Sequence, residues 1–321
     1  MLKTLHRPLV VTGIAMAVLS VVSLAGIFID DRTLLGVPIW LKPFKFFIST
    51  AIYNLTLAWL ISLVRDKGVR IAWWLGTIIA VALAIELVVI AGQALRGLRS
   101  HFNVSTGLDA ALWSIMGTSI VFVWVATAWI GVLLLRQRMP DRANALAIRL
   151  GLLIALFGLG VGFLMTSPTA AQLSTGSAPD FVGAHAVGVP DGGPGIPIVN
   201  WSTEGGDLRA PHFIGMHALQ ALPLIAFGLM FLSRRIPSLR DMARRARLVT
   251  AFAVFWGGLT VIVTWQALRG QSFIHPDALT WGALAAVVLA AVAIALTAFG
   301  IKPNASVAAE TKPTLTSAGA A

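Results

Sequence analysis

One acidic residue inside a long apolar segment is the first feature of this sequence that could do chemistry. Glu86 lies within the apolar segment 71–95, and Gln93 and Arg96 follow it seven and ten residues later. This spacing puts the three side chains along one stripe of a helix, with Glu86 about 13 Å below the end of the segment. Ionisable groups in such segments are costly and raise a functional hypothesis. Glu86 could accept a proton or anchor a bound group; a structural hydrogen-bond network between helices is the alternative.

Two histidines open the apolar segment 211–233. His212 and His217 are five residues apart, about 140° around an ideal helix, so they cannot both ligate one small metal ion without a partner elsewhere. The His-Glu-x-x-His spacing of a metalloprotease is absent. His217 lies about 9 Å into the segment and shares a helix face with Gln220, so it is the histidine that we favour most for a function.

Two further histidines occupy equivalent places. His101 precedes the apolar segment 108–135, and His275 precedes the segment 278–300. Together with His217 they are the candidate metal ligands. For His275, as for His212, a hydrogen-bonding role at the membrane surface is the simpler interpretation.

The hydrophilic stretch before His212 is also rich in functional groups. Glu204, Asp207 and Arg209 stand there among glycines, which suit a tight turn or a close approach to a ligand. No nucleophile elbow, phosphate loop or dinucleotide fingerprint is present. Lys42 and Lys45 open another apolar segment, where they either extend to the membrane surface or bind an anionic head group.

Composition decides the class of protein. Hydrophobic residues make up 57% of the 321 residues and charged residues only 12%, against about 25% charged in soluble domains. The absence of cysteine excludes disulfides, thiolate ligands, iron–sulfur clusters and a cysteine nucleophile. The net charge of +11 sits in short loops between apolar segments, so it reflects membrane topology rather than nucleic-acid binding. The lipid bilayer is the expected partner.

Eight segments are long enough to cross a bilayer, which takes about 20 apolar residues. They are 8–28, 44–64, 71–95, 108–135, 145–166, 211–233, 248–268 and 278–300. Each must be helical, because backbone polar groups find no water in lipid. The first is too long for a signal peptide and no clear cleavage site follows it, so we expect it to be retained. The sequence predicts an all-α polytopic membrane protein.

The basic residues predict the orientation. With eight spans both termini lie on one side, and 17 of the 24 Lys and Arg residues fall on that side, against 7 on the other. The positive-inside rule therefore places both termini in the cytoplasm, in a membrane of the bacterial plasma-membrane type. The basic stretch 234–247 is interpreted as a topology anchor, with anionic-lipid binding as the alternative.

Two short motifs recur in the same order. Gln-Ala-Leu-Arg-Gly occupies 93–97 and again 266–270, while Gly-Val-Pro-Ile at 36–39 is echoed by Gly-Ile-Pro-Ile at 195–198. This recurrence predicts an internal duplication of a four-helix unit. Four helices restore the orientation, so the units should be related by an axis along the membrane normal.

The duplication sets the expected organisation. Residues 1–143 form the first four-helix unit and residues 144–300 the second, with a long outer loop at 167–210. A polar tail at 301–321 is expected to be disordered and cytoplasmic. Long loops without structure are usually functional lids or disordered segments.

These residues converge on one predicted pocket near the outer leaflet. Its predicted members are Glu86, Gln93, Arg96, His101, His217, Gln220, Gln266 and Arg269. The loop from Trp201 to Arg209 is expected to cover it, and Glu204, Asp207 and Arg209 of this loop, with His212, are further candidates. Arg96 and Arg269 would supply charge-assisted hydrogen bonds to Glu86 or to a ligand carboxylate.

Eight helices in two four-helix units, with histidines towards the outer ends of helices, resemble heme A synthase. In that family, duplicated bundles place histidine pairs around a heme. The resemblance implies that His217 and His275 form the second-half pair and that His101 belongs to the first half. Span two offers Ser49 where a histidine would be expected, and the family's Glu-x-x-x-His motif is not evident. The resemblance covers the overall organisation and implies heme as the cofactor.

Three classes of function stay open. The first is a heme-binding or redox membrane protein with bis-histidine ligation. The second is a transporter or binder of a lipid or small organic anion, built around a central polar site. The third is an accessory subunit whose polar residues hold helices together. Whether the protein is an enzyme is not decided by any residue pattern.

Overall fold

The computed structural model of the protein describes residues 5–174 and 179–300. It confirms the predicted class, because eight helical stretches are long and apolar enough to cross a membrane. They are α1 Arg7–Ile29, α2 Leu41–Ile61, α3 Gly68–Leu95, α4 Gly107–Leu135, α5 Arg142–Leu164, α7 Arg209–Met216 with α8 Ala218–Leu232, α9 Met242–Leu268 and α10 Ala278–Thr297. The predicted tail at 301–321 lies outside the described residues.

The remaining elements are short. They are β1 Thr33–Leu34, β2 Val37–Pro38, α6 Ala170–Ser174, β3 Ala186–Val187, β4 Gly206–Asp207 and a 3-10 helix, Pro237–Arg240. β1 and β2 form an antiparallel hairpin, and β3 pairs with β4 with Ala186 opposite Asp207. The predicted long loop at 167–210 therefore contains regular pairing in its described part.

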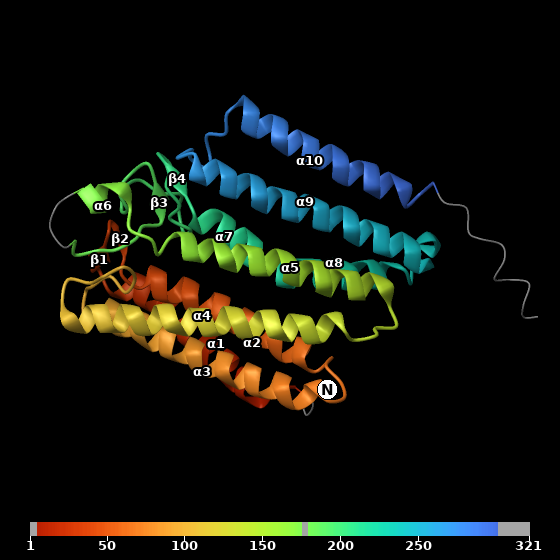
Figure 1. Ribbon diagram of the computed structural model, residues 1–321, viewed down its shortest axis with the longest axis horizontal. Coiled ribbons are helices and arrows are strands. Elements are labelled where there is room, and N and C mark those ends of the chain that lie inside the picture. The colour runs from red at the N-terminus through yellow and green to blue at the C-terminus, as the bar shows by residue number, and fades with distance from the viewer. Residues whose placement is uncertain (1–4, 175–178, 301–321) are drawn as a thin grey trace, which may run out of the picture.

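The connections gather at the two ends of the bundle (Figure 1). We call one of these ends the loop end. It carries the connections 30–40, 96–106, 165–174, 179–208 and 269–277. Among the helices that start at the loop end, α4 and α10 are capped by side chains, whereas α2 and α7 are not. Thr106 accepts from the N–H of Asp109, and Asp277 accepts from the N–H of Thr280. Such caps satisfy backbone donors that a helix start leaves free.

Span six is broken, although the sequence predicts one continuous helix. α7 ends at Met216 and α8 begins at Ala218. The indole of Trp256 donates to the carbonyl of Ile214 at 2.8 Å. The N–H of Gln220 bonds to the carbonyl of His217, three residues earlier, instead of four as in a regular α-helix. A side chain that takes a helical carbonyl in this way is a recognised cause of a helix break.

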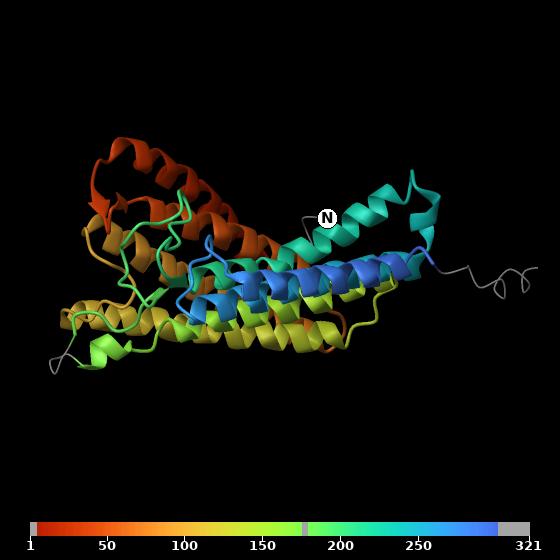
Figure 2. The same cartoon turned by 90° about the horizontal axis from the view of Figure 1, so that it is seen from above.

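Both sets of four spans pack in the same order. In the first, α1 packs on α2, α2 on α3, and α3 on α4; in the second, α5 packs on α7 and α8, these on α9, and α9 on α10. α4 and α5 meet between the two sets. Figure 1 shows α1 to α4 on one side and α5 to α10 on the other, and Figure 2 shows α1 leaning away from the other helices at the loop end.

Glycines permit the closest approach between two spans. A side chain at Gly158 of α5 would lie 2.5 Å from the backbone of Gly215 in α7. Small residues at helix interfaces let backbones approach in membranes, where dispersion contacts replace the hydrophobic effect between helices. This contact fixes the loop end of span six against span five.

The two Gln-Ala-Leu-Arg-Gly motifs end their helices in the same way. Gly97 and Gly270 have φ of +74° and +72°, and the N–H of the next residue bonds back to Gln93 at 2.9 Å or to Gln266 at 3.2 Å. This is the Schellman arrangement, in which glycine takes the left-handed conformation after the helix. The motif is therefore a helix terminator in both places.

Candidate functional site

A cavity of about 370 Å³ opens between the two sets of helices at the loop end. Residues of α2, α3, α4, α5 and α7 line it, and the β1–β2 hairpin and the long loop close it from the loop end. Most of its wall is apolar. Its aromatic lining consists of Phe46, Tyr53, Phe102, Trp113, Trp124, Phe163, Trp201 and Phe213. Such a pocket, apolar with a few polar groups, is the usual form of a small-molecule site.

Four basic side chains line this cavity: Lys42, Lys45, Arg99 and Arg209. Among the described residues, no carboxylate oxygen lies within 4 Å of the charged nitrogens of Lys42 or Arg99. Instead, Lys42 lies 5.7 Å from the ring centre of Phe46, and Arg99 lies 4.4 Å from that of Phe181. These two basic side chains are therefore available to a negatively charged ligand.

The other two basic residues hold the loop over the cavity. Lys45 donates to the carbonyl of Val199 at 3.0 Å. Arg209 donates to the carbonyl of Asn200 and forms an ion pair with Asp207 at 2.6 Å. The Lys45 contact joins residues that are far apart in the sequence, whereas Arg209 ties the nearby loop to the start of α7.

Glu86 lies deep in the cavity wall, on α3. It is only 3% exposed, and its Oε1 lies 3.7 Å from Nε2 of His101. Its Oε2 is buried and has no hydrogen-bond partner within the described part of the chain. Buried polar oxygens are nearly always bonded, so this one needs an explanation such as a bound ligand, a water or a proton.

His101 is enclosed by rings. The rings of Phe46 and Trp113 lie 5.5 Å from its ring centre, and that of His185 lies 6.5 Å away. Burial, assisted by the positive charge of Lys42, holds the pKa of His101 well below its usual range. His101 is therefore neutral near pH 7.

His185 and Asp191 bring a second pair of titratable groups from the long loop. Nδ1 of His185 lies 2.8 Å from Oδ2 of Asp191, whose Oδ1 also accepts from the N–H groups of His185 and Ala186. Burial lowers the pKa of His185 despite this partner. Burial opposes ionisation of Asp191, yet the hydrogen bonds from His185 and the backbone hold the pKa of that carboxyl below its usual range.

Four of the residues that the sequence predicts for the pocket line this cavity: Glu86, His101, Arg209 and His212. His212 is held by its own hydrogen bond, with Nδ1 2.8 Å from the carbonyl of Gly158. The cavity therefore brings together candidates from α3, α7 and the loop before α4.

Gln93 and Arg96 lie outside the cavity. Both donate to Oδ1 of Asp109 at 2.8 Å, where α4 begins. The cavity face of α3 consists instead of Leu83, Glu86, Ile90 and Ala94. At about 100° per residue Glu86 stands at one edge of this face, and Gln93 and Arg96 fall beyond that edge, where they meet Asp109 of α4.

In α9, Arg269 repeats the ion pair of Arg96, whereas Gln266 has a backbone partner instead of an acid. Gln266 donates to the carbonyl of Ser272 at 2.7 Å, and Arg269 forms an ion pair with Asp277 at the start of α10. Neither lines the cavity. The expectation that the two motif arginines bind a ligand in one pocket is thus not met: each ties a helix end to the next helix.

Two loop candidates also lie elsewhere. Asp207 is 2% exposed, but it accepts from the N–H of Ser202 and pairs with Arg209, so it supports the loop from beneath. Glu204 is exposed and is not part of the cavity lining. The residues of the long loop that do reach the cavity are His185, Asp191, Gly192 and Val199 to Trp201.

The remaining candidates are dispersed. His217 closes α7, with Nδ1 2.8 Å from the carbonyl of Phe213 in its own helix, and Gln220 donates to Thr56 of α2 at 3.3 Å. His275 is exposed at the loop end. None of the three lines the cavity.

Sequence reasoning missed His185, Asp191 and Arg99. His185 and Asp191 stand in a Gly- and Pro-rich loop with no periodic pattern, and only the path of that loop brings them to Glu86 and His101. Arg99 follows the first Gln-Ala-Leu-Arg-Gly motif, and its proximity to that motif was the only available signal.

No described group of three or more His, Asp or Glu side chains is placed to hold a metal ion. The histidine pair that the resemblance to heme A synthase implies, His217 and His275, does not face the cavity. The placement of the histidines therefore gives heme binding no support, and we assign no metal ligand.

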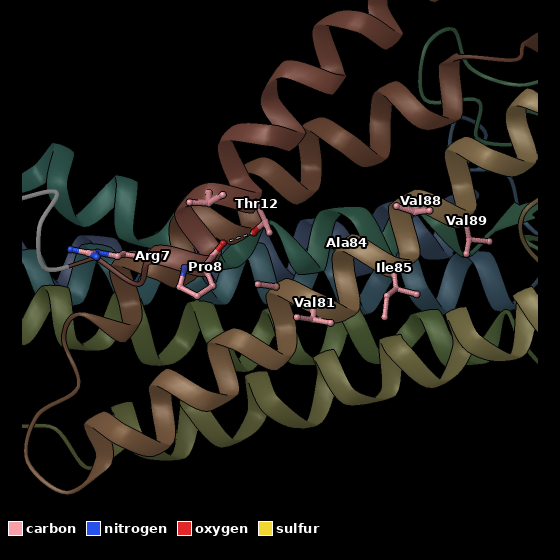
Figure 3. Close-up of a pocket in the computed structure, with 10 residues that line it drawn as sticks. Arg7, Pro8, Thr12, Val81, Ala84, Ile85, Val88 and Val89 are labelled. Atoms are coloured by element: carbon pink, nitrogen blue, oxygen red, sulfur yellow. Dashed lines mark hydrogen bonds between the residues drawn. The ribbon is translucent and has the colours of Figure 1, made fainter.

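A second hollow lies between α1 and α3 (Figure 3). It measures about 670 Å³ and its walls are apolar apart from Arg7 and Thr12. The hydroxyl of Thr12 already donates to the carbonyl of Pro8 at 2.9 Å. This crevice offers few groups for recognition, so the cavity at the loop end is the better candidate site.

Comparison of the chain with protein-family models, curated proteins and solved structures yields no match.

Proposed function

We propose that this integral membrane protein binds a lipophilic anion, an amphiphile with one acidic head group, in the cavity at its loop end. The observation that carries the proposal is the convergence of Lys42, Lys45, Arg99 and Arg209 on a cavity with aromatic and apolar walls. Cations gathered in a poorly hydrated site attract an anion strongly, because the interaction is weakly screened.

The charges of the lining favour an anion over a cation or a neutral lipid. The carboxylates in the lining are those of Glu86 and Asp191, and Asp191 is occupied by His185. Lys42 and Arg99 have no carboxylate within ion-pair distance among the described residues. An acidic head group placed between them would supply the missing charge.

The walls suit the other half of the ligand. Phe46, Trp113, Trp124 and Phe163 offer ring surface next to the cations. The apolar chain of the ligand would pack against these rings, which are as apolar as lipid. Its head group would stay near the loop end.

The arrangement of the two helix sets supports the placement of the site. We interpret 1–143 and 144–300 as duplicated units with the ligand between them. The shared packing order and the matching helix ends at Gly97 and Gly270 support this interpretation. The 17-to-7 division of basic residues favours a loop end that faces outward, with cytoplasmic termini.

Binding of a permanently charged probe tests the proposal. Purified protein in a neutral detergent is titrated with a fluorescent alkyl sulfonate and with the alcohol of equal chain length. The sulfonate should bind more tightly, and Lys42→Gln or Arg99→Gln should weaken it about tenfold, the effect of one charge-assisted hydrogen bond. The matched control is Lys67→Gln, because Lys67 is exposed at the opposite end.

Two results would count against the proposal. The first is equal binding of alcohol and sulfonate, which would indicate a purely apolar site. The second is unchanged affinity in both cavity variants. A Soret band in the absorption spectrum of the purified protein would instead favour the heme-binding alternative.

A further inference from the structure

Glu86 and His101 are poorly explained by anion binding alone. A carboxylate at the wall of an anion site repels the ligand, yet Glu86 lines the cavity and points one unbonded oxygen, Oε2, into a buried position. A neutral histidine beside it adds no attraction. Both groups would favour an anion only after taking up a proton.

We infer that the Glu86–His101 pair takes up one proton when the lipophilic anion binds, so that the protein links ligand binding to the proton concentration. This inference rests on the proposed function and deepens it. The proton comes from water and forms a new bond either to a carboxylate oxygen of Glu86 or to Nε2 of His101. No other bond breaks except the O–H bond of the donating hydronium ion.

The geometry lets the two side chains share the proton. Oε1 of Glu86 lies 3.7 Å from Nε2 of His101, slightly beyond direct hydrogen-bond distance, so a small movement or one water completes the contact. Groups this close titrate as a pair rather than separately. The unbonded Oε2 adds a place where a protonated carboxyl can donate to a ligand oxygen.

Charged groups from every side make the pair sensitive to an anion. Lys42 of α2 acts electrostatically on both Glu86 and His101, and His185 and His212 act on His101. Arg99, Arg209 and Asp191 complete the charged lining. In this positive environment His101 stays neutral until a bound anion compensates the surrounding charge, and its protonated form then becomes favourable.

His185 and Asp191 supply a route from the loop end. Asp191 lies 2.8 Å from His185, and the ring of His185 lies 6.5 Å from that of His101. One water between the two histidine rings would connect the loop to Glu86. The proton therefore does not need to cross the apolar part of the bundle.

Linkage gives the sign of the effect. If binding takes up a proton, lowering the pH must tighten binding, by up to about tenfold per pH unit for one proton. The test uses the alkyl sulfonate, whose charge is constant, between about pH 5.5 and about pH 8.5. A pH indicator in weakly buffered solution measures proton uptake directly in the unaltered protein. This measurement therefore needs no variant and cannot fail because a variant misfolds.

Two neutral replacements locate the proton. Glu86→Gln imitates the protonated carboxyl, so affinity should stay at its low-pH value at every pH if Glu86 is the acceptor. His101→Gln imitates the neutral ring, so affinity should stay at its high-pH value if His101 is the acceptor. The control is Glu204→Gln, because Glu204 is exposed outside the cavity and its variant should keep the full pH dependence.

The outcomes separate this inference from the proposed function. Binding that is independent of pH and releases or takes up no proton would overturn the proton linkage and leave the anion site intact. Full pH dependence in both Glu86→Gln and His101→Gln would also overturn it. Absence of sulfonate binding at any pH would instead reject the proposed function itself.

Discussion

Arg96 donates to Asp109 at 2.8 Å, across the turn that joins α3 to α4. Asp109 is only 1% exposed and also accepts from Gln93 and Thr106. In the corresponding pair of α9 and α10, Arg269 and Asp277, the aspartate side chain is 38% exposed. The motif arginine thus pairs with an aspartate at the start of the next helix in both places. The aspartate is buried in the first pair and partly exposed in the second.

This difference predicts unequal effects of removing the acid. Asp109→Ala should lower the free energy of unfolding by about 1–3 kcal/mol, because Arg96 and Gln93 lose the buried carboxylate to which both donate. Asp277→Ala should cost clearly less, since water can replace its contacts. Thermal unfolding in detergent measures both, and equal losses would contradict the assignment of Asp109 as the buried anchor.

The glycine that ends the first motif should be sensitive to substitution because of its backbone conformation. Gly97 has φ of +74°, and a methyl group at this position would have no neighbouring atom within 4 Å, so Gly97→Ala meets no clash. We expect a loss of about 1 kcal/mol from the left-handed conformation alone. Gly92→Ala, also without a contact but inside α3, is the control and should keep or raise the stability. A harmless Gly97→Ala would show that the turn relaxes.

The contact between α5 and α7 predicts a steric effect. Gly158→Ala would bring a methyl group to 2.5 Å from the backbone of Gly215, so the helices must separate. Overpacking of this kind should cost about 1–3 kcal/mol, measured as a lower unfolding temperature. Gly160→Ala is the matched control on the same helix, because its nearest contact is the indole nitrogen of Trp124 at 3.8 Å. Equal stability of the two variants would refute the close approach.

Burial of loop-end histidines predicts lower stability in acid. Burial lowers the pKa of His101 and His185 below the usual 6.5. The unfolded chain therefore binds protons that the ligand-free folded protein does not, so stability is complete above about pH 6.5 and falls as the pH drops through that value. The unfolding temperature should be lower at about pH 5 than at about pH 7.5. His185→Gln should reduce this difference, whereas His275→Gln, at an exposed position, should leave it unchanged.

The sequence alone determined the class of protein and its eight spans. Membrane-spanning helices depend on length and local composition, and both can be read along the chain. The predicted first and last residues of α1 and α4 agree with the structure to within one residue. In contrast, α9 begins at Met242, six residues before its predicted start. Basic residues at that start extend the helix beyond its apolar part, which a hydropathy criterion does not detect.

Only the tertiary structure decided which polar residues share a site. Glu86 and His101 were correctly placed together because they belong to one helix and the turn that follows it. Gln93 and Arg96 were not, since helix rotation turns them to Asp109. His185 and Asp191 reach the cavity through the fold of a long loop. Local sequence fixes a helix and its apolar character, but the contacts between distant segments are set by packing of the whole bundle.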